Sequence, residues 1–219
     1  MREKIIAIIL MCLPLGVMAQ NVWEKPKFES ENKEEAKKVS KTDKKEAKPN
    51  PDEKYLSGAV PVVDGVVEWS TTIDTYGTAE DNYQKMLKFL MEMCKESNQF
   101  ETSNVSLVNR AEHVIVAHFD EWLVFNKTFL SLDRTKFSYN LMATCTGNTV
   151  TLRLFRISYK YEEERNGGHL YKAEDWITDD WAMNKKQTKL TKFSGKFRRK
   201  TIDRKDNIFR TITTMLLIK

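Results

Sequence analysis

The stretch FSYNLMATCTGNTVTLRLFRISYKY, residues 137–161, decides how this chain folds. Apolar and polar side chains alternate along it, which is the period-two pattern of strands with one buried face. Gly147 and Asn148 in the middle form a turn signal that favours a tight connection between antiparallel strands. The apolar positions change parity between Leu154 and Phe155, which predicts a β-bulge. The sequence therefore predicts a long antiparallel hairpin.

The segments before this hairpin supply further strands and a helix. Residues 113–125 are rich in Val, Ile and aromatic residues and predict a long strand, and residues 104–109 predict a short one. A helix is expected over 78–97 because Thr78-Ala79-Glu80-Asp81 has the form of a capping box and apolar residues recur at helical spacing. Residues 67–73 alternate as a half-buried strand.

The C-terminal stretch 171–218 combines large aromatic residues with dense charge. Residues 176–184 indicate a short helical or irregular segment. Residues 185–200 are basic, have few apolar anchors and contain a Ser-Gly loop signal, so they are expected to form a loop. The last helix is expected from about Asp203, with Asp206 as its capping partner.

Together these elements predict a single α+β domain over 55–219, with the order β-α-β-β-β-β-α. A run of strands bracketed by helices indicates two layers, in which an antiparallel sheet carries two main helices on one face.

The first residues have the form of a secretory signal peptide over 1–19. A charged start precedes a short apolar run, and a small-residue cleavage site ends at Ala19. The apolar run is shorter than the ~20 residues of a membrane span, so no transmembrane segment is expected after cleavage. A retained anchor and a lipoprotein modified at Cys12 are the alternatives. The expected location is the periplasm, with secretion or membrane anchoring left open.

Residues 20–54 are rich in Lys, Glu and Ala and poor in apolar residues, which is typical of a disordered linker. After cleavage two cysteines remain, Cys94 and Cys145. Each falls on the apolar face of an expected element, where a free thiol packs as a small hydrophobe. A disulfide between them is the alternative in an exported protein.

The formal net charge of +5 hides an uneven distribution of charge. Residues 185–210 contain eleven Lys or Arg and two Asp, a net of +9, whereas residues 56–184 contain twelve Lys or Arg and nineteen Asp or Glu, a net of −7. Two interpretations remain open. The basic part forms a surface that attracts partners, or it lies against the acidic part and neutralises it.

No recognisable catalytic or cofactor motif is present. The sequence lacks a phosphate-binding loop, a G-x-S-x-G elbow and an H-E-x-x-H motif, and its three histidines have no metal-ligand spacing. We therefore expect no catalytic residue, metal ligand or cofactor. The alternative is a small envelope hydrolase that uses Asp175, Asp179 or Asp180, since Asp175 and Asp179 would share one face of a helix. Helix capping or pairing with nearby lysines is their plainer role.

The mixture of aromatic and basic residues near the C-terminus is the expected ligand- or partner-binding surface. Its predicted residues are Trp176, Trp181, Lys196, Arg198 and Arg199. Such a mixture also suits nucleic acid, but export argues against that partner. We expect a non-enzymatic module that binds an envelope protein or a polyanion such as a glycan or lipopolysaccharide. A structural subunit of an envelope assembly is a further alternative, and an open sheet edge or an uncovered apolar patch would indicate it.

Four blocks of the sequence resemble one protein family. They are YLSGAVPVVDGVVEWS (55–70), SLDRTKFSY (131–139), AEDWITDDWAMNKKQTKL (173–190) and GKFRRKTIDRKD (195–206). In combination they are similar to the domain of unknown function 4468, found in exported proteins of Gram-negative bacteria. The resemblance covers about 55–217 and implies a TATA-binding-protein-like (TBP-like) fold, a curved antiparallel sheet with helices on one face. It implies no reaction, cofactor or binding residue, and a fold alone does not assign a function.

Overall fold

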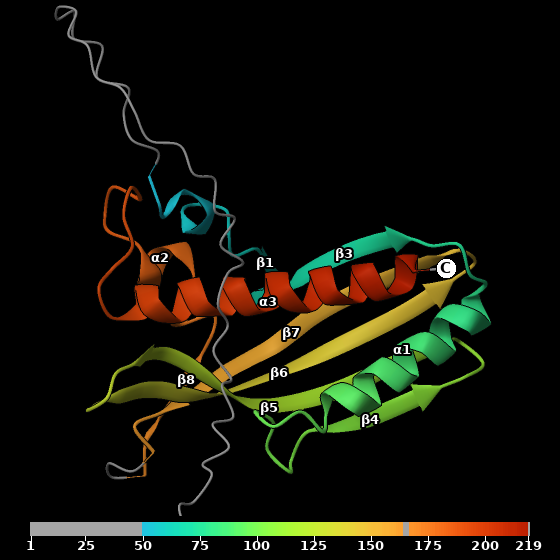
Figure 1. The fold of residues 1–219 in the computed structure, drawn as a ribbon. Coiled ribbons are helices and arrows are strands. Elements are labelled where there is room, and N and C mark those ends of the chain that lie inside the picture. The colour runs from blue at the N-terminus through green and yellow to red at the C-terminus, as the bar shows by residue number, and fades with distance from the viewer. Residues whose placement is uncertain (1–49, 164–166, 219) are drawn as a thin grey trace, which may run out of the picture. The chain divides into compact units, whose positions relative to one another are not determined.

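The computed structural model describes residues 50–163 and 167–218. The predicted signal peptide lies outside the described residues, and so does the predicted linker up to residue 49. Six strands form one antiparallel sheet (Figure 1). Five of them follow the order β4-β5-β6-β7-β3, and the sixth, β8, pairs with the end of β7. In chain order the elements are η1 (Glu53–Tyr55), β1 (Val62–Val63), β2 (Val66–Val67), β3 (Trp69–Asp74), α1 (Ala79–Met93), β4 (Asn104–Asn109), β5 (Val114–Lys127), β6 (Leu132–Thr146), β7 (Thr149–Tyr161), β8 (His169–Lys172), α2 (Asp179–Ala182) and α3 (Ser194–Leu217).

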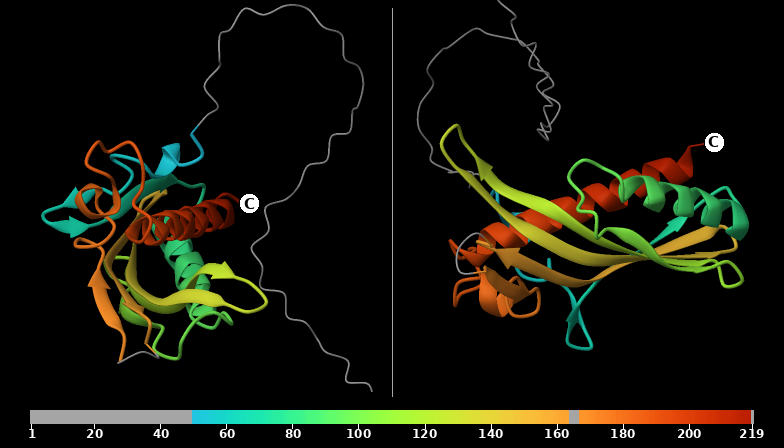
Figure 2. Two further views of the ribbon diagram at one scale, coloured as in Figure 1. Left: turned by 90° about the vertical axis from the view of Figure 1, so that its left-hand side faces the viewer. Right: turned by 90° about the horizontal axis from the view of Figure 1, so that it is seen from below.

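The two long helices, α1 and α3, lie on the same face of the sheet (Figure 1). The end of the β5–β6 hairpin curls toward α3, so the sheet is curved (Figure 2). This confirms the predicted α+β class and the β-α-β-β-β-β-α order. Two short elements, β8 and α2, are added between β7 and α3.

The central hairpin forms as the sequence predicts. In β6 the apolar side chains at alternate positions are buried under the helices. Gly147 has a positive φ of 57° in the turn to β7, a conformation that glycine adopts without strain. The bulge lies at Arg156, which has a φ of 54°, and there the register with β6 shifts between Ser138 and Asn140. It is therefore displaced by one or two residues from the predicted position.

The start of α1 is also confirmed. The side-chain oxygen of Thr78 accepts a hydrogen bond from the Asp81 amide at 3.2 Å, and the Asp81 carboxylate accepts one from the Thr78 amide at 3.1 Å. This reciprocal pair is a capping box, which satisfies two amides at the helix N-terminus.

The prediction for the start of the last helix is wrong. Helix α3 begins at Ser194, nine residues before Asp203, so residues 194–200 are helical and not part of a loop. The anchors of this first part are Phe197 and Arg198, whose side chains are completely buried. Gly195 is also required for packing, because a Cβ there would lie 2.9 Å from the Cβ of Leu190.

Asp203 does not cap a helix as predicted. Its carboxylate accepts hydrogen bonds from the Lys54 amino group at 2.6 Å and from the Tyr55 hydroxyl at 2.9 Å. Asp52 likewise pairs with Arg199. The last residues of the predicted linker therefore contact α3.

The basic helix α3 packs against the acidic sheet. The Arg204 guanidinium donates two hydrogen bonds of 2.7 Å to the carboxylate of Glu121 in β5, whose side chain is 1% exposed. The Tyr139 hydroxyl donates to the same carboxylate at 3.2 Å. For α3, the structure supports mutual neutralisation rather than a free basic surface.

Cys94 and Cys145 are both free thiols. Cys145 is buried in β6, and burial raises the pKa of its thiol to about 11. The packed thiols expected from the sequence are confirmed, and the alternative disulfide is not formed.

Replacing Arg204 by Met will test the ion pair between helix and sheet. It leaves the Glu121 carboxylate buried without its cation, so we expect the free energy of unfolding to fall by about 3–5 kcal/mol. Lys88→Met is the control, because Lys88 pairs with Glu92 at 3.9 Å on an exposed helix surface and such pairs contribute less than about 1 kcal/mol. Urea unfolding followed by circular dichroism measures both changes. Equal losses in the two variants would contradict this account.

Candidate functional site

Two loops lie at one end of the domain, next to the start of α3 (Figure 1). They are the β5–β6 turn, residues 128–131, and the α2–α3 loop, residues 183–193. In the left view of Figure 2, which faces this end, the two loops lie on opposite sides of it. We call this part of the molecule the loop end. All five predicted site residues lie in α2, in the first turns of α3 or just before α2.

The two tryptophans of the predicted site differ in environment. Trp176 stacks on Tyr171 with ring centroids 3.9 Å apart and contacts Phe193 and Phe197 edge-on. It therefore belongs to an aromatic cluster that packs around the N-terminal end of α3. Its indole nitrogen is buried without a hydrogen-bond partner among the described residues. Trp181, in α2, is 55% exposed and available to a ligand.

Lys196 is held by its own chain. Its amino group lies 2.7 Å from the Asp133 carboxylate and 2.9 Å from the Tyr161 hydroxyl. Burial lowers the pKa of this amine, but the bonds to Asp133 and Tyr161 outweigh that effect and the net pKa is raised. The ammonium also lies over four aromatic rings at 4.5–5.6 Å, those of Phe125, Tyr161, Phe193 and Phe197. Its charge is thus already satisfied.

Arg198 has an internal role. Its side chain is fully buried and donates to the carbonyls of Tyr55 and Leu56, each at 2.6 Å, and of Ile177 at 2.9 Å. It also donates to the Asp179 carboxylate at 2.6 Å. The Arg198 guanidinium therefore joins two segments to α3, the N-terminal segment around Tyr55 and Leu56 and the segment before α2. Because it is fully buried, this guanidinium is not accessible to a ligand.

Arg199 is only partly available. Its guanidinium donates two hydrogen bonds of 2.7 Å to the carboxylate of Asp52. Of the five predicted site residues, only Trp181 is largely exposed. The structure does not bring the five together as one open surface.

Four lysines that the sequence analysis did not single out carry the free positive charge of the loop end. Lys185, Lys186, Lys189 and Lys192 are exposed, and none of them forms an ion pair within the described residues. We call these four residues the lysine loop. Exposed Trp181 precedes it and half-exposed Phe193 follows it. The predicted basic stretch therefore divides at Ser194 into a free loop and a paired helix.

The lysine loop has a defined backbone. The Asn184 side-chain oxygen accepts hydrogen bonds from the amides of Thr188 and Lys189, at 2.9 and 3.2 Å. The amide of Asn184 donates to the Lys189 carbonyl, and the amide of Thr191 donates to the Ala182 carbonyl. A loop that is ordered before binding loses less conformational entropy when a ligand binds.

Comparison with known proteins identifies the family. Residues 69–160 match the model of a domain of unknown function (DUF4468) with TBP-like fold. The crystal structure of a DUF4468 family protein from Bacteroides ovatus ATCC 8483 is similar to this chain with 35% sequence identity and a TM-score of 0.71, covering 78% of this chain and 97% of that one. This chain belongs to the DUF4468 family.

A second solved structure shares the fold of this DUF4468 domain. A TBP-like protein from Parabacteroides distasonis ATCC 8503 has a TM-score of 0.58 and 22% identity, covering 72% of this chain and 96% of that one. No curated protein matches the chain. The resemblance deduced from the four sequence blocks is confirmed.

The carboxylates of the hydrolase alternative do not converge in the DUF4468 domain. Asp179 accepts hydrogen bonds from the Ser57 hydroxyl and the Gly58 amide and pairs with Arg198, whereas Asp175 and Asp180 are exposed. Burial raises the pKa of Asp179, but the hydrogen bonds from Ser57 and Arg198 outweigh it and the net pKa is lowered. A carboxyl group of this kind is ionised at neutral pH and is not suited to donate a proton.

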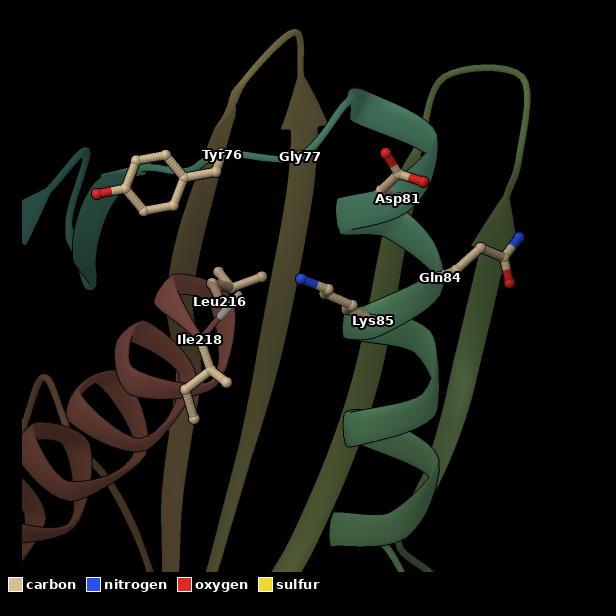
Figure 3. Close-up of a pocket in the computed structure, with 7 residues that line it drawn as sticks. All are labelled: Tyr76, Gly77, Asp81, Gln84, Lys85, Leu216 and Ile218. Atoms are coloured by element: carbon tan, nitrogen blue, oxygen red, sulfur yellow. The ribbon is translucent and has the colours of Figure 1, made fainter.

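A cleft of about 400 Å³ lies at the opposite end of the domain, between the start of α1 and the end of α3 (Figure 3). Two of the polar residues that line it have structural roles. Asp81 completes the capping box of α1, and the Gln84 side chain donates a hydrogen bond to the Glu80 carboxylate. Within 50–163 and 167–218 no group of three or more His, Cys, Asp or Glu is placed to hold a metal ion. No helix in the same residues is long and apolar enough to cross a membrane.

Asp179→Asn will test the contact that holds Arg198. Because the folded-state pKa of Asp179 is lowered, its charge stabilises the fold above the unfolded pKa of about 3.9, and this contribution disappears as pH falls through the folded value. We expect the variant to lose roughly 2–3 kcal/mol at pH 7, and its difference from wild type to shrink below about pH 4.

The control for this experiment is Asp180→Asn, the exposed neighbour in α2. Its unfolding curve should superimpose on that of wild type at both pH values. A loss that stays constant from pH 7 to pH 3 in Asp179→Asn would show that charge at this position does not stabilise Arg198.

Proposed function

We propose that this chain is an exported, non-catalytic binding module of the cell envelope that binds an acidic polymer through the lysine loop. The observation that carries the proposal is that Lys185, Lys186, Lys189 and Lys192 are exposed on an ordered loop and form no ion pair with any residue that the structure describes. Export is supported by residues 1–19, which have the pattern of a signal peptide. Fractionation of cells that produce the full chain tests it, and the protein should be found in the periplasm.

The distribution of charge favours an anionic ligand. The basic residues of α3 that face the sheet or the N-terminal segment are largely paired with carboxylates, as Lys196, Arg198, Arg199 and Arg204 show. The lysine loop, in contrast, presents four amino groups to solvent, where they attract a polyanion before contact and bind it after contact. Long-range attraction of this kind falls as salt is added.

The aromatic side chains beside the lysines favour a ligand that has apolar surface as well as negative charge. Trp181 is exposed next to the loop, and Phe193 is half-exposed directly after it. Large aromatic side chains contribute most of their binding free energy by covering apolar surface. A ligand with both anionic groups and apolar faces, such as an acidic glycan or lipopolysaccharide, suits this combination better than a small inorganic anion.

A structural subunit of an envelope assembly is the second candidate function. Strand β4 is an edge of the sheet, and its Leu107 and Val108 are exposed. Open edges of this type can pair with another chain. Sedimentation velocity across a range of protein concentrations separates the two candidates, because a subunit of this kind self-associates and the binding module stays monomeric without ligand.

The quadruple variant Lys185→Gln, Lys186→Gln, Lys189→Gln and Lys192→Gln will test the proposed function. Wild-type protein should bind polygalacturonate or purified lipopolysaccharide with an affinity that falls roughly tenfold to a hundredfold between about 50 and 200 mM salt. The quadruple variant should lose most of the binding and most of the salt dependence. Fluorescence anisotropy with labelled ligand measures both.

The matched control removes four charges elsewhere. Lys85, Lys88, Lys95 and Arg210 are exposed residues of α1, its C-terminal end and α3, away from the loop end. Their replacement by Gln produces the same change in net charge and should reduce affinity only slightly. If the control variant loses as much affinity as the lysine-loop variant, net charge and not a site explains binding.

A further inference from the structure

The turn at the tip of the β5–β6 hairpin exposes two large apolar side chains side by side. Phe129 is 101% exposed and Leu130 is 89% exposed. The turn that carries them is closed by a hydrogen bond of 2.8 Å from the Thr128 amide to the Ser131 carbonyl. Isolated surface leucines are common, but two adjacent, fully exposed apolar side chains at a protruding tip indicate a contact with another apolar phase.

The hairpin holds this tip away from the domain. The β5–β6 ladder continues to the Lys127–Leu132 pair, directly before the turn. Close to the turn, Phe125 packs on Phe197 with ring centroids 4.5 Å apart, and Asp133 accepts a hydrogen bond from Lys196. The curved hairpin is therefore fixed to the start of α3, and its tip projects beyond the body of the domain (Figure 2).

Further apolar surface and positive charge surround the tip. Leu132 is half-exposed beside it, and we call Phe129, Leu130 and Leu132 the apolar tip. Lys127 is exposed on the strand that leads into the turn and forms no ion pair within the described residues. The lysine loop lies at the same end of the molecule (Figure 1). The apolar tip and five lysines that form no ion pair within residues 50–163 and 167–218 thus lie at one end of the molecule, with the lysine loop on the opposite side of it from the tip (Figure 2).

We propose that the loop end docks on an anionic phospholipid bilayer, with Phe129 and Leu130 inserted between the acyl chains and the lysine loop on the headgroups. This inference rests on the proposed function of the lysine loop and names the apolar tip as a second element. A bilayer offers an apolar layer directly beneath a plane of negative charge. That arrangement matches a projecting tip with lysines spread across the same end.

The two elements contribute to binding by different mechanisms. Transfer of a Phe or Leu side chain from water to hydrocarbon changes a partition coefficient by roughly tenfold or more. Each lysine near an anionic surface contributes roughly fivefold, and this contribution falls with salt. Loss of the tip should therefore weaken bilayer binding at every salt concentration, whereas loss of the lysines should weaken it mainly at low salt.

The test is co-sedimentation of the full chain with vesicles of phosphatidylcholine alone or of phosphatidylcholine with phosphatidylglycerol. The tip variant is Phe129→Ser with Leu130→Ser, and the matched control is Val62→Ser with Val63→Ser in the exposed strand β1. Wild type and control should bind the anionic vesicles and not the neutral ones. The tip variant should lose at least tenfold in apparent affinity for the anionic vesicles. It should keep full binding to polygalacturonate.

Each other outcome identifies what failed. Binding to polygalacturonate without binding to anionic vesicles overturns the bilayer inference and leaves the proposed function intact, and absence of both overturns both. Vesicle binding that is unchanged in the tip variant overturns insertion of the tip. Self-association of the wild type that disappears in the tip variant, without vesicle binding, would assign the tip to a second copy and overturn the proposal.

Discussion

The buried guanidinium of Arg198 determines how the C-terminal half of the domain is arranged. It donates to the carbonyls of Tyr55, Leu56 and Ile177 and to the carboxylate of Asp179. A buried cation is tolerated only when its donors are satisfied in this way. The requirement draws the N-terminal segment and the segment before α2 onto the first turns of α3. The chain between α2 and α3 must then form an external loop, and its lysines are left in solvent.

This arrangement explains why some cations of the basic stretch are paired with carboxylates whereas their neighbours in the sequence are exposed to solvent. Lys196, Arg199 and Arg204 face carboxylates on other elements and are neutralised by them, so they stabilise the fold instead of binding ligands. The residues of the lysine loop are exposed and form no ion pair among the described residues. A formally continuous basic stretch is thus divided between a structural and a binding role. The proposed ligand class depends on the second part alone.

Local sequence signals identified strands β3 to β7, the bulge to within two residues, the capping box of α1 and the family, because alternation and capping are short-range properties. They did not identify the start of α3. Ser194 and Gly195 have the form of a loop, but the close packing of Gly195 on Leu190 and the long-range contact of Arg198 with Tyr55 accommodate this segment as a helix. The same contacts decide which cations are free. For this reason sequence alone selected Lys196, Arg198 and Arg199 and not the lysine loop. The apolar tip depends likewise on how far the hairpin projects, which alternation does not show.

Acylation of the lysines by an amine-reactive reagent, followed by mass spectrometry, tests the central claim most directly. The claim is that the lysine loop is free to bind a polyanion, whereas Lys196 is held by Asp133 and Tyr161. In the free protein the four loop lysines should react rapidly and Lys196 slowly, and added polygalacturonate should protect the loop lysines. Rapid modification of Lys196, or loop lysines that stay fully reactive in the presence of saturating polyanion, would contradict the account.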